Sequence, residues 1–265
     1  MIEKERFSGK TILVTGAGGN IGLAVASRFA EEGASVALLD LKGLEEAKNH
    51  ITGLGCRHVE AYVCDVTDYQ AVSDTVEKVV KDFGRIDMLF NNAGYQGDFK
   101  KIHEYPADDF QRVIQINTIG AFHVLQRVSA HMVNSGGGAI VNTASMAGVE
   151  GPPNMVAYGA SKFAMIGMTE TASKDLAPFA IRVNSIAPAF MGPGYMWTRQ
   201  VEMQAAAGSQ YFAADPKAVA QQMIGQVPMR RYGDINEIPG TVVFLMSDEA
   251  SYITGVNIPI AGGIL

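Results

Sequence analysis

The sequence has little of several features that mark specialised classes of protein. It contains two cysteines, Cys56 and Cys64, among 265 residues, which is too few for a disulfide framework. No apolar run approaches the roughly 20 residues that a membrane-spanning helix needs. The net charge of −6 provides no basic surface for nucleic acid or an anionic membrane. We therefore expect neither a nucleic-acid partner nor a membrane partner.

Metal-ligand clusters and an export signal are also missing from the pattern. The five histidines and two cysteines form no group with zinc spacing, so we expect no metal. Residues 1–6 are mostly charged and precede no apolar stretch, which argues against a secretory signal. With 48% hydrophobic and 18% charged residues, the composition is that of a folded globular chain. We expect a cytoplasmic protein that acts on a small molecule.

Short apolar or β-branched stretches alternate with segments of helical spacing along almost the whole chain. We expect strands at residues 11–15, 35–40, 58–64, 86–90, 139–143, 181–187 and 256–260. Between two of them, Val72, Val76, Val79 and Phe83 repeat at helical spacing. Strands separated by helices pair in parallel through right-handed crossovers. The pattern predicts an α/β fold: one domain over residues 1–265, a doubly wound parallel sheet of about seven strands with helices on both faces.

One long stretch, residues 191–232, interrupts this alternation. It contains no strand-like run, and Gly192-Pro193-Gly194 and Pro228 punctuate it. An insertion this long inside a compact α/β domain is usually functional, so we expect a lid over a substrate crevice. An irregular surface excursion or a subunit contact is the alternative.

A glycine-rich turn follows the first expected strand. Residues 16–22 read Gly-Ala-Gly-Gly-Asn-Ile-Gly and lead into a helix. Glycine lets the backbone approach a pyrophosphate, which the free N–H groups and dipole of a helix start then stabilise. Isoleucine breaks the literal G-x-G-x-x-G pattern, so a purely structural turn is the alternative. The residues expected to hold a dinucleotide here are Gly16, Gly19, Asn20, Ile21 and Gly22.

The second expected strand ends in an acidic residue, Asp40, which Leu41 follows. A carboxylate at this position can accept both hydroxyls of an adenosine ribose and would repel a 2′-phosphate. No lysine or arginine occurs in the glycine-rich turn, although Lys42 is close. We therefore expect NAD rather than NADP, with Asp40 and Leu41 at the ribose. Capping of the next helix is the alternative role for Asp40.

Tyr158 and Lys162 stand four residues apart within a helical pattern. Residues at this spacing share one helix face, so the ammonium can lie near the phenol. A nearby cation favours the phenolate, which would make the tyrosine usable as an acid and base. Taken alone, such a pair is more often simply exposed on a helix surface.

Further residues complete a set in a fixed order: the glycine-rich turn, Asn91-Asn92-Ala93-Gly94, Asn117, Ser145, and Tyr158 with Lys162. Over residues 9–263 the chain resembles the short-chain dehydrogenase/reductase family, whose members have a Rossmann fold. Within that family it is most similar to NAD-dependent polyol dehydrogenases of the xylitol dehydrogenase kind. The resemblance implies hydride transfer between an alcohol and a nicotinamide cofactor, and assembly as a homotetramer.

The resemblance also implies a role for each site residue. Ser145 would hold the substrate oxygen, Tyr158 would exchange the proton, and Lys162 would lower the tyrosine pKa and hold the nicotinamide ribose. Asn117 would anchor a proton-relaying water, although a buried asparagine commonly serves backbone groups instead. The remaining cofactor contacts implied by the resemblance are Asp65, Val66, Asn92, Ala93, Gly94, Pro188 and Met191.

Three positions depart from the family pattern. Asn20 stands where the family usually has the middle glycine of the turn, and asparagine tolerates positive φ. Ala189 replaces the glycine that usually follows Pro188. Pro193 replaces a threonine that usually contacts the nicotinamide end, so cofactor contact at the lid would rest on Met191 and its neighbours.

The expected substrate residues mix polar and large apolar side chains: Gln96, Ser145, Met146, Asn154, Tyr195 and Met196. A linear polyol would require more hydrogen-bond partners than these supply, and a cyclic or secondary alcohol or a compact ketone suits such walls better. The leading hypothesis is an NAD-dependent oxidoreductase that interconverts a secondary alcohol or polyol and its ketone. The alternatives are an NADPH-dependent carbonyl reductase of acyl or cyclic ketones and a non-catalytic, NAD-sensing protein.

Overall fold

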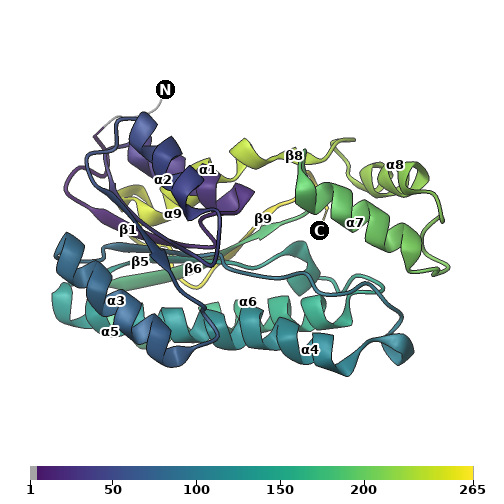
Figure 1. The fold of residues 1–265 in the computed structure, drawn as a ribbon, viewed down its shortest axis with the longest axis horizontal. Coiled ribbons are helices and arrows are strands. Elements are labelled where there is room, and N and C mark those ends of the chain that lie inside the picture. Colours follow the sequence, from purple (N-terminus) through teal and green to yellow (C-terminus); the bar gives the residue numbers. More distant parts are fainter. Residues whose placement is uncertain (1–4, 265) are drawn as a thin grey trace.

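The computed structural model describes residues 5–264 and has a seven-stranded parallel sheet at its centre (Figure 1). The strands lie in the order β3-β2-β1-β4-β5-β6-β9. Their bounds are β1 Thr11–Thr15, β2 Ser35–Asp40, β3 Val59–Val63, β4 Met88–Asn91, β5 Gly138–Thr143, β6 Ile181–Pro188 and β9 Asn257–Ile260. Residues 1–4, which include most of the charged start used to argue against a signal segment, lie outside the described residues.

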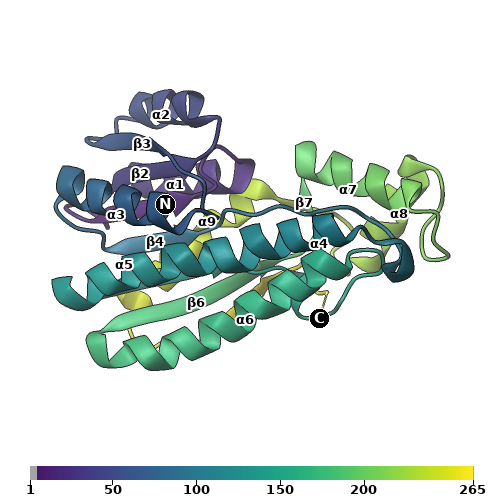
Figure 2. The ribbon, with the colours of Figure 1, turned by 60° about the horizontal axis from the view of Figure 1, so that its bottom comes forward.

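Helices cover both faces of the sheet (Figures 1 and 2). The helices α1, α2 and α9 lie on one face and α3, α4, α5 and α6 on the other. A separate hydrophobic core fills each interface, one with Phe29 of α1 fully buried and one with Val79 of α3 fully buried. The helix bounds are α1 Asn20–Glu31, α2 Leu44–Gly53, α3 Tyr69–Phe83, α4 Ala107–Ile114, α5 Ala121–Ser135, α6 Val156–Leu176, α7 Tyr195–Ala206, α8 Pro216–Gln226 and α9 Pro239–Met246.

The predicted doubly wound fold is confirmed. The central strands are largely apolar because both of their faces are covered, and all five residues of β1 are buried. Expected and observed strand bounds differ by at most two residues at an end. The largest difference is at β4, which begins at Met88 because Ile86 and Asp87 only lead the chain into the ladder.

The expectation that residues 191–232 contain no strand is wrong at one end. Met191–Gly192 form β7, which pairs in parallel with β8, Gly233–Asp234, beyond the main sheet. A two-residue strand is too short to leave an apolar pattern in the sequence, which explains the miss. Helices α7 and α8 make up much of the remaining stretch and pack against each other around Val201 and Met223.

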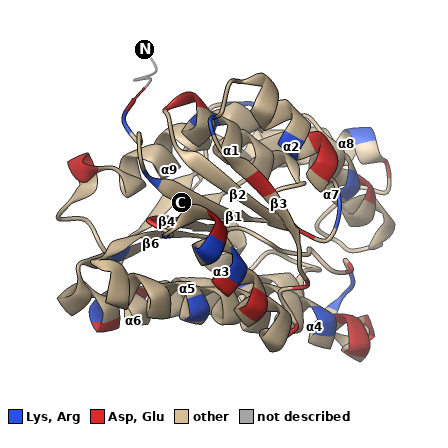
Figure 3. Cartoon of the chain, turned by 60° about the vertical axis from the view of Figure 1, so that its left-hand side comes forward, with Lys and Arg blue, Asp and Glu red and all other residues tan. Residues whose placement is uncertain are grey.

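The strand order places a crevice at the carboxyl ends of the central strands. Strand β1 lies between β2 and β4. After β1 the chain adds β2 and β3 on one side of it, and then adds β4 and the later strands of the sheet on the other side. Ligands of open α/β sheets bind outside the strand ends at such a switch point. Within residues 5–264, no helix is long and apolar enough to cross a membrane. Figure 3 shows acidic and basic residues interspersed on the helices of the face in view.

Candidate functional site

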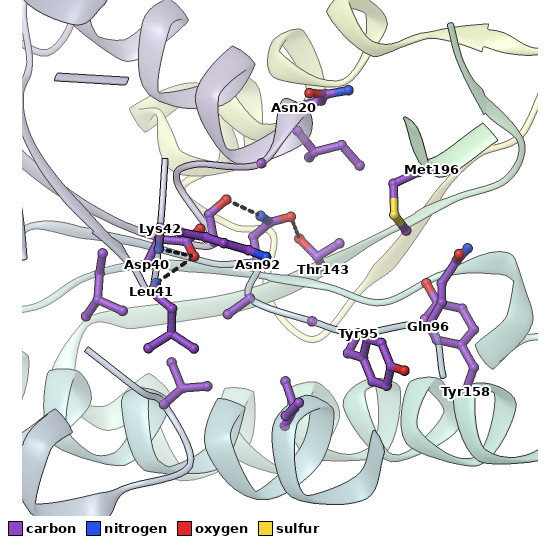
Figure 4. A pocket seen from close by; sticks show the side chains of 18 of the residues that line it. Asn20, Asp40, Leu41, Lys42, Asn92, Tyr95, Gln96, Thr143, Tyr158 and Met196 are labelled. Carbon is purple, nitrogen blue, oxygen red and sulfur yellow. Dashed lines mark hydrogen bonds between the residues drawn. The ribbon is translucent and has the colours of Figure 1, made fainter. Parts of the chain in front are cut away.

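Two adjoining cavities lie where the central strands end. One, of about 630 Å³, reaches Asp40 and is called the Asp40 cavity below. The other, of about 720 Å³, reaches Ser145 and is called the Ser145 cavity. Figure 4 shows Asp40 and Tyr158 toward opposite ends of the view. Six residues line both cavities and mark their junction: Ile21, Gln96, Thr143, Tyr158, Met191 and Met196.

The glycine-rich turn is packed too tightly for side chains at its key positions. A Cβ on Gly22 would lie 2.1 Å from the carbonyl oxygen of Gly16, and Gly16 itself has φ +66°. Gly19 caps the start of α1 without any side-chain acceptor, and the first helical turn contains no acidic residue. The free N–H groups and the dipole at this helix end therefore suit an anion. Gly16, Gly19, Asn20 and Ile21 line the Asp40 cavity, and Gly22 lies beneath the turn.

Asp40 fastens the second strand to the glycine-rich turn. Its Oδ2 accepts the N–H of Gly18 at 3.0 Å, and its Oδ1 accepts the N–H of Leu41 at 2.7 Å. It does not cap the next helix, since α2 begins at Leu44 after Gly43 as its N-cap. Figure 4 shows Asp40, Leu41 and Lys42 together on one side of the cavity. Asp65 and Val66 also line the Asp40 cavity.

A hydrogen-bond relay supports the Asn92-Ala93 segment. The Oγ1 of Thr15 accepts the N–H groups of Asn92 and Ala93 at 2.8 and 3.0 Å. The Oγ1 of Thr143 donates to the Oδ1 of Asn92 at 3.1 Å, as Figure 4 shows. Asn92, Ala93 and Gly94 all line the Asp40 cavity. Sequence reasoning missed Thr15 and Thr143, whose only signal is that each ends a buried strand at the crevice.

Tyr158, Lys162 and Ser145 converge at the junction of the two cavities. Tyr158 lies on α6 and lines both cavities, Lys162 lines the Asp40 cavity, and Ser145 follows β5 and lines the Ser145 cavity. The Nζ of Lys162 donates to the carbonyl oxygen of Thr143 at 2.7 Å. The Oγ of Ser145 accepts the N–H of Ala147 at 3.1 Å and donates to the carbonyl oxygen of Pro188 at 3.4 Å.

Burial controls the ionisation of the two groups on α6. It raises the pKa of the Tyr158 phenol, and the hydrogen bond with Ser145 offsets part of that rise. Burial also lowers the pKa of Lys162 to about 8. Loss of water around the phenol is the largest effect on its pKa in this structure, and the expected lowering of that pKa by Lys162 stays a prediction.

Asn117 lies in a short π-helical stretch, Gln115–Gly120, between α4 and α5. Its Oδ1 accepts the N–H of Tyr95 at 2.7 Å, and its Nδ2 donates to the carbonyl oxygen of Tyr95 at 2.8 Å and to the Oγ of Ser161 at 3.0 Å. The side chain thus serves backbone groups, the alternative considered for it from the sequence. It ties the loop after β4 to α6, on which Tyr158 lies.

Some of the expected substrate residues line the Ser145 cavity and others line neither cavity. Gln96, Ser145, Met146 and Met196 line the Ser145 cavity, and so does Pro188, which was expected at the cofactor. Asn154 lines neither cavity, because its Nδ2 donates to Gln204 and Ser209 at 2.8 and 3.0 Å. Tyr195 is 73% exposed and also lines neither. Lining residues that sequence reasoning missed include Glu150, Gln200, Gln204, Tyr211, Phe212, Met223 and Gln226.

Comparison with known proteins agrees with this architecture. Residues 16–264 match the family model described as enoyl-(acyl carrier protein) reductase. A crystal structure of NAD+-bound xylitol dehydrogenase is 64% identical, covers 98% of this chain and 100% of its own, and superposes with a TM-score of 0.97.

Two curated relatives have other activities. Levodione reductase of Leifsonia aquatica is 37% identical over 97% of this chain and 95% of its own. The 3-oxoacyl-[acyl-carrier-protein] reductase FabG of Thermotoga maritima is 37% identical over 98% of this chain and 99% of its own. The protein is an oxidoreductase that belongs to the short-chain dehydrogenase/reductase family.

Proposed function

We propose that the protein interconverts a secondary alcohol, with a xylitol-like polyol as first candidate, and its ketone, using NAD. The observation that carries the proposal is the meeting of Tyr158, Ser145 and Lys162 at the junction of two cavities, one of which is shaped for a dinucleotide. The 64% identity to a xylitol dehydrogenase supports the polyol as first candidate.

The residues of the Asp40 cavity fit a nicotinamide dinucleotide. The uncapped start of α1 suits a pyrophosphate, and the crowded Gly22 leaves the turn no room for a side chain beneath it. Asp40 keeps carboxylate lone pairs available for ribose hydroxyls and disfavours a 2′-phosphate. When bound, the dinucleotide would accept or supply the hydride, which carries two electrons.

The side chains at the junction would handle the proton. In ketone reduction the phenol of Tyr158 gives its proton to the carbonyl oxygen as the hydride reaches the carbonyl carbon. In alcohol oxidation the phenolate takes the hydroxyl proton as the hydride leaves the same carbon. The Oγ of Ser145 would hold the reacting oxygen by a hydrogen bond. Lys162, anchored to Thr143, would hold the ribose next to the reacting ring.

The lining of the Ser145 cavity favours an uncharged substrate. Among the described residues that line it, none is lysine or arginine, and Glu150 is acidic. Glutamines 96, 200, 204 and 226 supply hydrogen-bonding amides, as a hydroxylated substrate requires. An anionic substrate would leave its charge without a partner there.

A second candidate is the reduction of a compact cyclic ketone. The same cavity has a large apolar portion made by Met146, Met155, Phe212 and Met223. The similarity to levodione reductase supports this candidate, which uses the same proton and hydride transfers in the opposite direction.

The test is a panel of substrates measured through NADH absorbance. Purified protein is incubated with xylitol or cyclohexanol and either NAD+ or NADP+, and with a small cyclic ketone and either NADH or NADPH. We expect oxidation of a polyol or secondary alcohol with NAD and much weaker activity with NADP. Absence of turnover with every substrate would contradict the proposal, and a strong preference for NADP would contradict the role given to Asp40. The resemblance to this family also leads us to propose that the protein is cytoplasmic and forms a homotetramer. Light scattering, which gives the molar mass in solution, tests the tetramer.

A further inference from the structure

Gln96 presents a fixed hydrogen-bond donor to the substrate side of the site. It is 7% exposed and lines both cavities together with Tyr158. Its Oε1 accepts from the Nη1 of Arg199 at 3.3 Å. A guanidinium has only donors, so the oxygen of the Gln96 amide must face Arg199 and the Nε2 must face away from it. Within residues 5–264 the Nε2 has no hydrogen-bond partner, so both of its N–H groups are available to a ligand.

Arg199 is held in place by three contacts with one loop. Besides Gln96, its Nη2 donates to the carbonyl oxygen of Gly97 at 2.9 Å. Its guanidinium carbon lies 5.9 Å from the ring centre of Phe99, which is buried. These contacts join α7, from the stretch expected to form a lid, to the loop after β4.

The loop that carries Gln96 packs against α4. Gly97 has φ +70°, and a Cβ there would lie 2.5 Å from the Cγ2 of Val113. The Oδ2 of Asp109 accepts the N–H of Asp98 at 2.8 Å and the hydroxyl of Tyr105 at 2.7 Å. The backbone on either side of Gln96 is therefore fixed, and only its side-chain amide needs a further contact to set its direction.

We propose that Arg199 is a positioning residue that fixes the Gln96 amide as a donor to a substrate oxygen near the reacting carbon, so that the site selects hydroxylated substrates over apolar ones. This proposal rests on the proposed function and adds the group that recognises the substrate. An apolar secondary alcohol has no second oxygen for Gln96, whereas a polyol has one on each neighbouring carbon. Losing the donor therefore weakens polyol binding and leaves an apolar alcohol nearly unaffected.

Separate variants remove the amide of Gln96 and the Arg199 side chain that positions it. Gln96→Leu removes the amide, Arg199→Met removes the guanidinium that positions it, and Arg199→Lys keeps a donor for the Gln96 oxygen. Arg57→Met, on an arginine that is 78% exposed and distant in the fold, is the matched control.

The experiment compares kcat and KM for xylitol and for cyclohexanol with saturating NAD. We expect Gln96→Leu, which removes the amide without adding a charge, to raise the KM for xylitol about tenfold, as the loss of one hydrogen bond predicts, with a much smaller change in either constant for cyclohexanol. Arg199→Met has the same selective effect, and Arg199→Lys partly restores the lower KM. The double variant Gln96→Leu/Arg199→Met is no worse than Gln96→Leu, because the two residues act through one contact. Arg57→Met behaves as the wild type.

Equal losses on xylitol and cyclohexanol, or additive effects of the two substitutions, would overturn the proposal. If the wild type turns over neither alcohol, the proposed function fails separately. Calorimetric titration of xylitol into the NAD+ complexes of the wild type, Gln96→Leu and Arg199→Met then decides the inference. Weaker binding in both variants supports it, and unchanged or undetectable binding in all three overturns it.

Discussion

The Nζ of Lys162 lies 5.6 Å from the ring centre of Tyr158, one helical turn away on α6. The helix fixes this separation, and the hydrogen bond from the Nζ to Thr143 fixes the direction of the lysine side chain. Lys162 is buried and Tyr158 is partly buried, and loss of water shifts the pKa of each group more than their mutual charge does.

The raised pKa of Tyr158 predicts opposite pH profiles for the two directions of the reaction. The phenol stays protonated through neutral pH, which serves ketone reduction, whereas alcohol oxidation needs the small phenolate fraction. We expect kcat/KM for oxidation to rise about tenfold per pH unit through the neutral range, while kcat/KM for reduction stays flat. Steady-state rates from pH 6 to 10 test this, and an oxidation rate that is flat with pH would contradict it.

Ser145→Ala should move the oxidation profile to still higher pH. The hydrogen bond with Ser145 lowers the pKa of Tyr158, so its loss leaves the phenol less acidic. The substitution also removes a hydrogen bond to the reacting oxygen, so the maximal rate should fall as well. The same pH series measures both effects. A lower rate with an unshifted profile would show that Ser145 does not act on the ionisation of Tyr158.

Lys162→Met should stabilise the protein in a pH-dependent manner. The pKa of Lys162 is about 8 in the folded protein against an ordinary value of 10.5. Below pH 8 the lysine is charged in both the folded and the unfolded chain, so the folded state carries the full cost of the buried ammonium. Between pH 8 and 10.5 the folded lysine loses its proton first, and the cost disappears.

The gain in unfolding free energy should therefore be largest at pH 7, at most about 3 kcal/mol, and should shrink toward pH 10. Urea unfolding of the variant and the wild type at both pH values measures this difference. Lys217→Met, on an exposed lysine of α8, is the control. A difference that is the same at pH 7 and pH 10 would contradict the explanation.

Gly22→Ala should damage the glycine-rich turn. The new Cβ would lie 2.1 Å from the carbonyl oxygen of Gly16, so the turn must shift at a cost of about 1–3 kcal/mol and lose affinity for the dinucleotide. Gly53→Ala, at the end of α2 with nothing within 4 Å of its added Cβ, should be neutral or stabilise by about 0.5 kcal/mol. NADH titration and thermal unfolding compare the two variants. Equal behaviour would disprove the steric argument.

Asp40→Asn should weaken the preference for NAD over NADP by about tenfold or more. The asparagine oxygen can still accept the N–H of Gly18, although the N–H of Leu41 loses its acceptor, and the charge that repels a 2′-phosphate is lost. The ratio of kcat/KM values for the two cofactors is the readout. A lower unfolding temperature with an unchanged ratio would show that Asp40 only supports the turn.

The sequence predicts the sheet and much of the lining of the Asp40 cavity because their signals are local. Continuous apolar runs predict buried strands. The glycine-rich turn and Asp40 each come at the end of a strand, and Tyr158 and Lys162 share one helix face. The pairing of β7 with β8 leaves no such signal, because two residues cannot show a period.

The lining of the Ser145 cavity depends on contacts between distant segments. Asn154 looks free in the sequence, yet it is bound to Gln204 and Ser209, more than 45 positions away. Gln204 and Met223 reach the Ser145 cavity only because α7 and α8 pack over it. The raised pKa of Tyr158 likewise reflects burial by several segments, which its spacing from Lys162 does not reveal.

The most direct test of the catalytic role of Tyr158 is the turnover of Tyr158→Phe with the best alcohol of the panel, with Tyr252→Phe, on a fully exposed ring, as control. Phenylalanine keeps the ring and removes only the proton-bearing oxygen. We predict that kcat falls by about 10²–10⁴-fold in Tyr158→Phe while NADH binding persists, and that Tyr252→Phe is unchanged. Turnover of Tyr158→Phe within a fewfold of the wild type would contradict the account.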